Sequence, residues 1–218
     1  MGLPIHVVIP FKNQGTKSRL ATVLSPQERQ LLSFAMLKDV LDAVSGLGRV
    51  TILSRPGLDV LDIGYDVEIQ ESELDLNDVI NALIAEVARH GWPSDILIVM
   101  ADLALLTEKD VVGILNCEGD VVFCPGRGGG TNMILIRSPM FRTCYQGLSF
   151  PKHLAFARQK GLEVSVFESF RAGCDIDEPE DLAEVLLHGR GRSKTVLEDM
   201  GFVLSEDGRA GPGSLFRL

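Results

Sequence analysis

Three cationic side chains follow the first apolar run of the chain. Lys12, Lys17 and Arg19 lie in a polar loop directly after residues 5–9, which have the composition of a buried strand that Pro10 ends. Open α/β sheets bind their ligands at the carboxyl ends of the strands. We therefore expect this loop to bind phosphate groups, and the alternative is an ordinary solvated basic loop.

The P-loop is the first motif to compare with this stretch. A P-loop needs glycine directly before its lysine, where this chain has Thr16. It also needs a glycine five residues before that position, where this chain has Phe11. The sequence therefore excludes a P-loop, and the three cations indicate a different kind of phosphate-binding loop.

Carboxylates follow expected strands elsewhere in the chain. Asp102 lies just past the apolar run at residues 96–100, and Asp175 and Asp177 belong to an acidic cluster. In an extended segment these two acids share one face, with Ile176 on the other. Carboxylate oxygens suit Mg²⁺, so the three acids are candidate metal ligands. The alternatives are a turn role for Asp102 and a helix-capping role for Asp177, and we expect Asp177 to cap the next helix without losing its possible metal role.

A glycine cluster at residues 126–130 leads into an expected strand at residues 133–136. Because no helix follows, the cluster is not a dinucleotide-binding fingerprint. Consecutive glycines let backbone amides approach an anion, and the alternative is a flexible hairpin. Ser149 opens an expected helix, whose N-terminus would attract anions. His153 in that helix is expected to lie on the surface without a role.

Strands and helices alternate along most of the chain. The expected strands lie at residues 5–9, 50–53, 67–69, 96–100, 121–124, 133–136 and 164–167. The expected helices lie at residues 26–44, from Asp75 or Asn77 through Val87, and at residues 107–115, 149–161 and 178–187. Ser25, Pro26 and Glu28 form the strongest helix start, because they fit a capping box. This alternation predicts an α/β fold whose mostly parallel sheet has helices on both faces.

The chain length and this alternation place residues 1–190 in one domain and leave residues 191–218 as a C-terminal tail. The tail has a helix-like segment at residues 193–200, an expected strand at residues 202–204 and an Asp-Gly turn signal for a hairpin returning toward Leu215. Its apolar side chains are too few for a separate core and too many to leave in water. We expect the tail to pack across a twofold axis in a homodimer, and packing on the same subunit is an equal alternative.

The composition is that of an ordinary globular protein, with 45% hydrophobic and 23% charged residues. A net charge of -9 argues against nucleic-acid binding. No apolar run approaches the roughly 20 residues that cross a membrane, and no secretory signal is apparent. The four cysteines lack the paired spacing of zinc sites or disulfide frameworks. We expect a cytoplasmic protein whose partners are small molecules rather than nucleic acid or membrane.

Several segments together resemble the archaeal 2-phospho-L-lactate guanylyltransferase family of deazaflavin coenzyme F-420 biosynthesis. The matching segments are Ile9-Pro10-Phe11-Lys12, Thr16-Lys17-Ser18-Arg19-Leu20, Leu76-Asn77, Ala101-Asp102-Leu103, Arg127-Gly128-Gly129-Gly130-Thr131-Asn132, residues 147–153, and Asp175-Ile176-Asp177-Glu178-Pro179-Glu180-Asp181-Leu182. Each segment alone is weak, but their order and spacing over residues 5–187 are specific. The resemblance implies the three-layer α/β/α fold of nucleotide-diphospho-sugar transferases and other nucleotidyltransferases, with a mixed, mostly parallel central sheet.

The same resemblance implies transfer of GMP from GTP to (2S)-2-phospholactate with release of pyrophosphate and with Mg²⁺ as cofactor. The side chains implied for the GTP phosphates are Lys12, Lys17 and Arg19, of which Lys17 and Arg19 are the catalytic pair. Asn77 and its neighbour Leu76 are expected near the base. The implied metal ligands are Asp102 with Asp175 or Asp177. The positions that resemble acceptor-binding residues of the family are Thr131, Gly147 and Ser149.

Two other interpretations remain open from the sequence. One is another nucleotidyltransferase of the same fold, with a different base or with phosphoenolpyruvate as the acceptor, because a fold does not fix a substrate. The other is a catalytically silent nucleotide-binding regulator, which would keep the basic loop and lose metal binding. Magnesium-dependent release of pyrophosphate separates the enzyme from the regulator.

Overall fold

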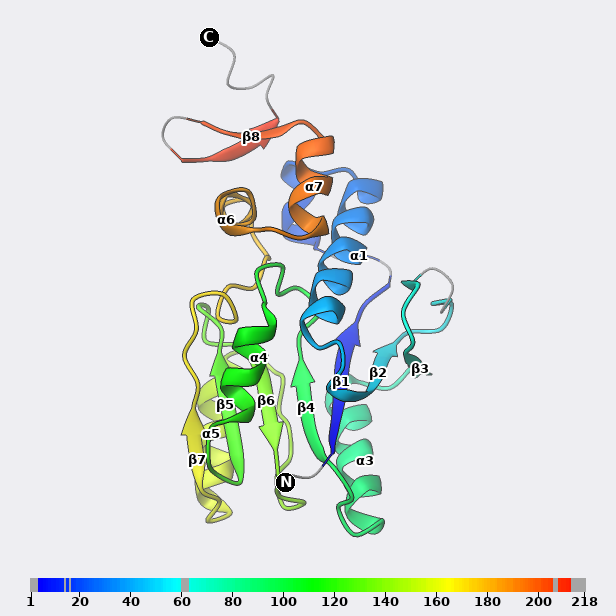
Figure 1. Cartoon of the computed structure of the whole chain (residues 1–218), viewed down its shortest axis with the longest axis vertical. Coiled ribbons are helices and arrows are strands. Elements are labelled where there is room, and N and C mark those ends of the chain that lie inside the picture. Colours follow the sequence, from blue (N-terminus) through cyan, green and yellow to red (C-terminus); the bar gives the residue numbers. More distant parts are fainter. Residues whose placement is uncertain (1–3, 14, 16, 60–62, 206–207, 213–218) are drawn as a thin grey trace.

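The central feature of the computed structural model is one mixed sheet, seen in Figure 1. The structure describes residues 4–13, 15, 17–59, 63–205 and 208–212. The described strands are β1 (Ile5–Phe11), β2 (Gly48–Ser54), β3 (Glu68–Glu71), β4 (Asp95–Val99), β5 (Val121–Pro125), β6 (Thr131–Ile136), β7 (Val164–Val166), β8 (Phe202–Leu204) and β9 (Ala210–Pro212). The described helices are the 3-10 helix η1 (Ser18–Thr22), α1 (Pro26–Ala43), α3 (Leu76–Arg89), α4 (Glu108–Leu115), α5 (Ser149–Gln159), α6 (Asp181–His188) and α7 (Arg192–Asp199).

The strand order of the central sheet is β3-β2-β1-β4-β6-β5-β7. Strands β1, β2, β3 and β4 pair in parallel, and β5 pairs in parallel with β7. Strand β6 pairs antiparallel with both of its neighbours, β4 and β5. The expected mixed and mostly parallel sheet is therefore confirmed, with β6 as its reversed strand.

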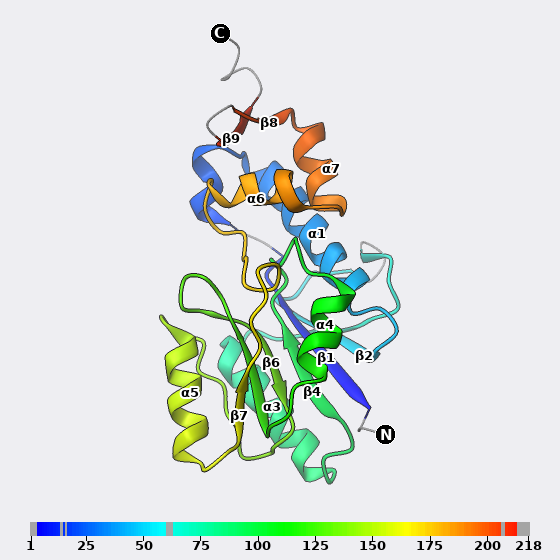
Figure 2. The same ribbon diagram turned by 60° about the vertical axis from the view of Figure 1, so that its left-hand side comes forward.

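Helices cover both faces of this sheet, which confirms the three layers (Figures 1 and 2). Helices α1 and α4 bury one apolar cluster against it, to which Leu37 and Ile114 belong. Helices α3 and α5 bury a second cluster against the other face, to which Ile80 and Ala157 belong. Burial of such apolar faces is what holds the layers together.

Strand β1 continues through Pro10, so the prediction that Pro10 ends the strand is wrong. Pro10 pairs in register with Leu53 of β2. On the other side of β1, the pairing with β4 ends at Val8 opposite Ile98. A proline in a strand costs a ladder bond only where its nitrogen faces a partner. Past the end of the β4 pairing, Pro10 is tolerated, and β1 delivers the basic loop directly to the carboxyl edge of the sheet.

Helix α1 begins as the sequence predicts. Ser25 accepts a hydrogen bond from the backbone of Glu28, and the Glu28 carboxylate accepts one from the backbone of Ser25. This reciprocal capping box satisfies two amide groups that the first turn leaves unpaired. At the start of α3 the Asp75 side chain accepts from the backbone of Asn77, and Thr107 and Asp110 form a capping box at the start of α4.

The predicted cap at Asp177 is wrong. Helix α6 begins only at Asp181, and its N-cap residue, Glu180, makes no side-chain cap. The carboxylate of Asp181 instead accepts from the backbone N–H groups of Asp177 and Glu178, at 2.9 and 2.8 Å. The Asp181 carboxylate thus satisfies these two backbone groups. The Asp177 carboxylate makes no cap and is available for the site.

The glycine cluster is the turn between the antiparallel strands β5 and β6. Gly126 N–H donates to the Gly130 carbonyl at 3.0 Å, and Gly129 adopts a positive φ of 77°. The cluster therefore forms a hairpin turn, which is the alternative that the sequence offers, and anion binding by its amides stays a prediction. Gly129 also accepts from the backbone of Phe150, so the turn ties β6 to the start of α5.

The tail docks on the rest of the chain at the carboxyl end of the sheet (Figures 1 and 2). Helix α7 packs along α1, and Leu197 and Phe202 are buried in a third apolar cluster together with Leu32 of α1. The predicted hairpin is confirmed, because β8 pairs antiparallel with β9. Leu215, toward which the hairpin was expected to return, lies outside the described residues.

Two further expectations concern cysteines and membranes. All four cysteines are free thiols, as the spacing predicts. None of the helices in the described part of the chain is long and apolar enough to cross a membrane.

Candidate functional site

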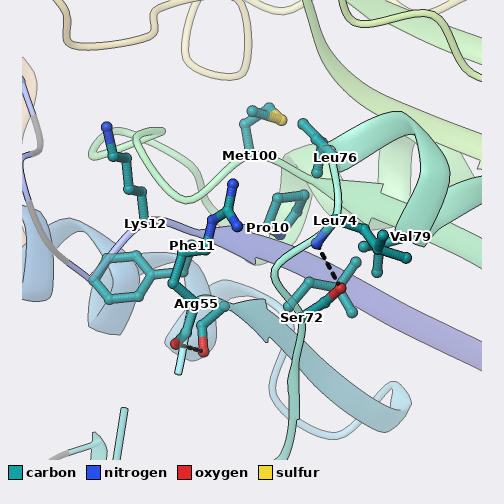
Figure 3. Close-up of a pocket in the computed structure, with 11 residues that line it drawn as sticks. Pro10, Phe11, Lys12, Arg55, Ser72, Leu74, Leu76, Val79 and Met100 are labelled. Carbon is teal, nitrogen blue, oxygen red and sulfur yellow. Dashed lines mark hydrogen bonds between the residues drawn. The ribbon is translucent and has the colours of Figure 1, made fainter. Parts of the chain in front are cut away.

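Three adjoining cavities follow one another along the carboxyl edge of the sheet. The first, of about 400 Å³, lies between the ends of β1 and β2 and the segment leading into α3 (Figure 3). The second, of about 280 Å³, shares Lys12 and Met100 with the first. The third, of about 180 Å³, shares Met100, Asp102 and Asp177 with the second. A ligand with several parts could therefore extend through all three.

Lys17 stands where the second and third cavities meet. Its Nζ donates to Asp102 Oδ2 at 2.7 Å and to Asp177 Oδ1 at 2.8 Å, and its side chain is only 10% exposed. Burial alone would lower the pKa of Lys17, but the charges and hydrogen bonds of the two carboxylates outweigh burial and raise it. The ammonium group is therefore a fixed positive charge at the centre of the site.

Lys12 and Arg19 flank this centre in different ways. Lys12 is exposed, lines the first two cavities and makes no hydrogen bond or ion pair with a described residue. Arg19 lies farther out, where its guanidinium is 3.7 Å from Asp177 and 3.2 Å from Glu178. The structure thus brings two of the three predicted cations into the cavities and leaves Arg19 at their rim, tied to the acidic cluster.

The three predicted acids face one cavity. Asp102, Asp175 and Asp177 all line the third cavity, although they come from two distant parts of the chain. The backbone N–H of Ile176 donates to the Asp102 carbonyl at 3.2 Å and joins these two parts. Burial first, and then the negative charges of Asp102 and Asp177, raise the pKa of Asp175, while a hydrogen bond from Asn132 opposes the rise. The mutual repulsion shows that the acids share one electrostatic environment.

The donor set can be tested for its fit to Mg²⁺. Asp102 and Asp177 already direct carboxylate oxygens at a single cation, the Lys17 ammonium. A metal ion near Asp175 would also counter the burial and the neighbouring negative charges that raise its pKa. Among the described residues, however, no three acidic, histidine or cysteine side chains are gathered in ligand positions. The oxygen chemistry fits Mg²⁺, provided that Lys17 moves from between the two carboxylates.

The predicted acceptor residues meet in the third cavity. Thr131 comes from the start of β6, Gly147 from the loop before α5 and Ser149 from the first position of α5, and all three line the cavity. Thr131 Oγ1 lies 3.0 Å from Ser149 Oγ. These three positions are therefore brought together, as the resemblance implied.

The side chain of Asn77 is buried and hydrogen-bonded to the protein, so it is not open to a ligand. Its Oδ1 accepts from the backbone N–H of Tyr145 at 2.6 Å, and the residue is buried. Its neighbour Leu76 lines the first cavity. The amide group thus holds the loop before α5 in place, and Leu76 rather than Asn77 faces the first cavity.

Some residues of the site were not recognised from the sequence. Asn132 and Tyr145 line the third cavity, and His153 is fully buried beside it rather than on the surface. Asn132 lies in the glycine-cluster motif, so its position after the turn is a signal that could have indicated it. No pattern in the neighbouring sequence indicates that Tyr145 or His153 belongs to the site, because their contacts are made with the sheet and with the loop before α5.

Comparisons with known proteins show which family and which fold this chain is similar to. The sequence model of the family described as "Guanylyl transferase CofC like" matches residues 5–212. The 2-phospho-L-lactate guanylyltransferases of Methanothrix thermoacetophila and Methanoregula boonei are 51% and 41% identical to this chain, and each match covers 94% of both chains. A crystal structure from Desulfovibrio desulfuricans G20, provisionally described as a nucleotide-diphospho-sugar transferase, has a TM-score of 0.74 and 19% identity and covers 91% of this chain and 95% of that chain. This last likeness confirms the expected nucleotidyltransferase fold.

Proposed function

The chain belongs to the guanylyl transferase CofC-like family, and we propose that it transfers GMP from GTP to the phosphate of (2S)-2-phospholactate in the biosynthesis of coenzyme F-420. The enzyme is a nucleotidyltransferase, as its relatives are. The observation that carries the proposal is the Lys17 ammonium between Asp102 and Asp177 at the junction of two cavities. A cation beside carboxylates is what a site needs in order to handle both phosphates and a metal ion.

The three cavities suggest an assignment of the substrate parts. The guanine base takes the first cavity, whose wall includes Leu76 and Val79. The triphosphate takes the second, with Lys12 and Lys17 on its wall and Arg19 at the rim. Phospholactate takes the third, which at about 180 Å³ suits a small phospho-acid.

The reaction needs positioning and neutralisation of charge more than proton transfer. A phosphate oxygen of the acceptor forms a bond to the α-phosphorus of GTP, and the bond from that phosphorus to the bridging oxygen breaks. The electron pair leaves with pyrophosphate. Because the second pKa of a phosphate ester lies near about 6, the attacking oxygen is already ionised at neutral pH. Lys12, Lys17 and Arg19 supply positive charge to the phosphates, and no general base is required.

We assign Mg²⁺ as the cofactor, held by Asp102 with Asp175 or Asp177. When bound, the ion supplies charge neutralisation at the phosphate oxygens. Lys17 balances the charge of Asp102 and Asp177 in this structure, and with those carboxylates on a metal ion its ammonium would be available to the phosphates.

We also propose that the protein acts in the cytoplasm as a homodimer. Its cysteines are free thiols, as suits a reducing compartment. The hairpin of β8 and β9 lies beyond α6 and α7 (Figure 1), and its Val203 is 45% exposed. A second hairpin packed on this strand would bury that apolar side chain twice around a twofold axis.

A pyrophosphate-release assay tests the substrate assignment. GTP, ATP, CTP and UTP are each combined with 2-phospholactate, phosphoenolpyruvate and 3-phosphoglycerate in the presence of Mg²⁺. We expect GTP with 2-phospholactate to give the highest kcat/KM. Preference for phosphoenolpyruvate would assign the other acceptor, and no release in any combination would favour the silent regulator.

A further inference from the structure

His153 on α5 is fully enclosed beside the third cavity. Its ring stacks on Phe123 with the centroids 6.0 Å apart, and it meets the rings of Phe141 and Tyr145 edge-on. Burial lowers the pKa of His153 to about 4, so the imidazole is neutral at neutral pH. A neutral imidazole has one N–H donor and one acceptor nitrogen, and its partners decide which nitrogen is which.

The partners of His153 fix the direction of its hydrogen bonds. The backbone N–H of Cys144 lies 2.8 Å from Nε2. A backbone amide can only donate, so Nε2 is the acceptor and Nδ1 carries the proton. Nδ1 lies 2.9 Å from Thr131 Oγ1, which therefore accepts from the ring. The hydrogen of the Thr131 hydroxyl then needs an acceptor, and Ser149 Oγ, 3.0 Å away, is in reach to accept it.

We call the series of hydrogen bonds from His153 through Thr131 to Ser149 the relay, and Ser149 is its last member. With Thr131 as the donor, the Ser149 oxygen is the acceptor, and its side chain has no other hydrogen-bond partner within the described residues. The side chain is buried and lines the third cavity. Its own hydroxyl hydrogen is therefore left for a group inside that cavity. A free serine could donate or accept, whereas this one is held as a donor.

Tyr145 provides a second, independent donor at the same place. Tyr145 lines the third cavity, and its buried hydroxyl has no partner within the described part of the chain. Burial raises the pKa of Tyr145, so the phenol keeps its proton. An unpaired buried hydroxyl costs free energy unless a ligand satisfies it.

We propose that His153 acts through Thr131 to fix Ser149 as a donor, and that Ser149 and Tyr145 together bind the carboxylate of the acceptor. The inference rests on the proposed function for the identity of the acceptor. Ser149 and Tyr145 line the third cavity and are absent from the wall of the second, whereas Asp102 lines both. The acceptor's phosphate must lie near the shared end, next to the nucleotide, so its carboxylate falls at the end with the two hydroxyls. His153 is a positioning residue, since it reaches the substrate only through the relay.

Substitutions along the relay test the proposal by steady-state kinetics at saturating GTP. A hydrogen bond to a charged group is lost in Ser149→Ala, so we expect KM for 2-phospholactate to rise about 10- to 100-fold. Thr131→Val keeps the shape of the side chain, removes the relay and should raise the same KM about tenfold by the same reasoning. The double variant should be no worse than Ser149→Ala alone, because Thr131 acts through Ser149. The KM for GTP should stay unchanged in all three.

The chain offers a matched control for Thr131→Val. His6 Nε2 and Thr51 Oγ1 form another buried histidine–threonine hydrogen bond of 2.8 Å, and neither residue lines the third cavity. Thr51→Val therefore makes the same chemical change away from the acceptor, and we expect no change in KM for 2-phospholactate. A rise equal to that of Thr131→Val would show a general loss of structure and would overturn the proposal.

Selectivity for the carboxylate is a second readout. Isopropyl phosphate has a methyl group in place of the carboxylate of phospholactate. The wild-type enzyme should prefer phospholactate, and Ser149→Ala and Tyr145→Phe should each reduce that preference about tenfold or more. Equal losses with both acceptors would mean that the hydroxyls do not bind the carboxylate, which would overturn the proposal.

The tautomer of His153 tests the relay without any turnover. Nitrogen-15 NMR of the imidazole should show a neutral ring with its proton on Nδ1 at pH 7. A proton on Nε2 would contradict the relay whatever the substrate is. Absence of turnover with every phospho-acid in the wild-type enzyme would contradict the proposed function, and the tautomer would still decide the relay.

Discussion

Lys17 holds its ammonium between two carboxylates from a left-handed backbone conformation, with φ of 51°. A non-glycine residue in this region costs of order 1 kcal/mol, and the surrounding contacts must compensate for it. Asp102 and Asp177 are 23% and 41% exposed, so solvent screens both ion pairs and limits their contribution to stability. A strained lysine with modest structural benefit is typical of a functional site, which is the reason for the first prediction.

Lys17→Ala should lower turnover far more than stability. Loss of a cation that stabilises charge at the transition state costs about 2–4 kcal/mol, or roughly a 30- to 1000-fold loss in kcat. The thermal unfolding midpoint should change little, because both carboxylates remain solvated. Lys109→Ala, an exposed lysine on α4, is the control and should change neither quantity. A folded Lys17→Ala protein with near-normal turnover would remove Lys17 from the phosphate site.

Asp102→Asn should abolish the response to magnesium and leave the fold intact. The amide keeps the shape of the carboxylate and loses the charge that would hold the ion. The measurement is the initial rate against Mg²⁺ concentration, with Asp199→Asn at the exposed end of α7 as control. We expect a loss of at least about 100-fold at the wild-type optimum, since a cation contribution of several kcal/mol is removed. A normal rate at the normal optimum would show that Asp102 is not a ligand.

Among the elements, α1 and α7 are joined by one buried acid. The Asp39 carboxylate of α1 accepts from the backbone N–H groups of Arg192 and Ser193, and from the Ser193 hydroxyl at 2.6 Å. Helix α7 has no side-chain cap of its own at Gly191. Asp39 therefore caps α7 from another helix, and a Cβ at Gly191 would come within 2.3 Å of the Asp39 carboxylate. Glycine is required there by the close approach.

Asp39→Ala should destabilise the protein by about 2–4 kcal/mol, because it leaves buried amide donors and a hydroxyl unpaired. Asp42→Ala, one turn farther along α1, removes a half-exposed ion pair with Arg192 and an exposed hydrogen bond from the Tyr65 hydroxyl, and should cost only about 1 kcal/mol. Urea unfolding of the two variants measures the difference. Equal effects would show that the buried hydrogen bonds of Asp39 do not hold α7 in place.

The starts of several helices could be predicted because their signals are local. Ser25 and Glu28 lie three residues apart and complete their own capping box. The assignment of Asp177 as a cap failed because α6 begins only at Asp181, and the Asp177 carboxylate accepts from the Lys17 ammonium instead. The length of β1 depended on where its pairing with β4 ends, which no residue near Pro10 indicates.

The site could be predicted in part for the same reason. Asp102, Asp175 and Asp177 follow recognisable segments, and the resemblance to a family gave them roles. The shared ammonium of Lys17 and the relay through His153 depend on residues that meet only after the sheet has formed. His153 carries no local signal of burial, because the rings that enclose it come from β5 and from the loop before α5.

At the scale of the whole molecule, the C-terminal tail at residues 191–218 bears on both the domain boundary and the oligomeric state. Leu197 and Phe202 pack in the same apolar cluster as Leu32, so the tail shares a core with the preceding residues. The structure therefore supports packing on the same subunit for α7, and the proposed dimer contact is confined to the hairpin. Residues 1–190 as a separate folding unit remain a prediction.

Val203→Lys tests the homodimer without disturbing that core, because Val203 is exposed on β8. We expect the wild-type chain to sediment as a dimer at micromolar concentration. A charge buried at a twofold contact meets its own copy and is repelled, so the variant should sediment as a monomer with an unchanged unfolding midpoint. A monomeric wild type would rule out the dimer, and a dimeric variant would place the interface elsewhere.

Transfer of GMP from GTP to the acceptor can be followed with isotopic labels. The enzyme is incubated with Mg²⁺, 2-phospholactate and GTP labelled with phosphorus-32 either at the α-phosphate or at the γ-phosphate, and the products are separated. If the acceptor's phosphate attacks the α-phosphorus, the α-label appears in a product joined to phospholactate and the γ-label appears in pyrophosphate. Transfer of the γ-label to phospholactate, or release of pyrophosphate at the same rate without an acceptor, would contradict the account.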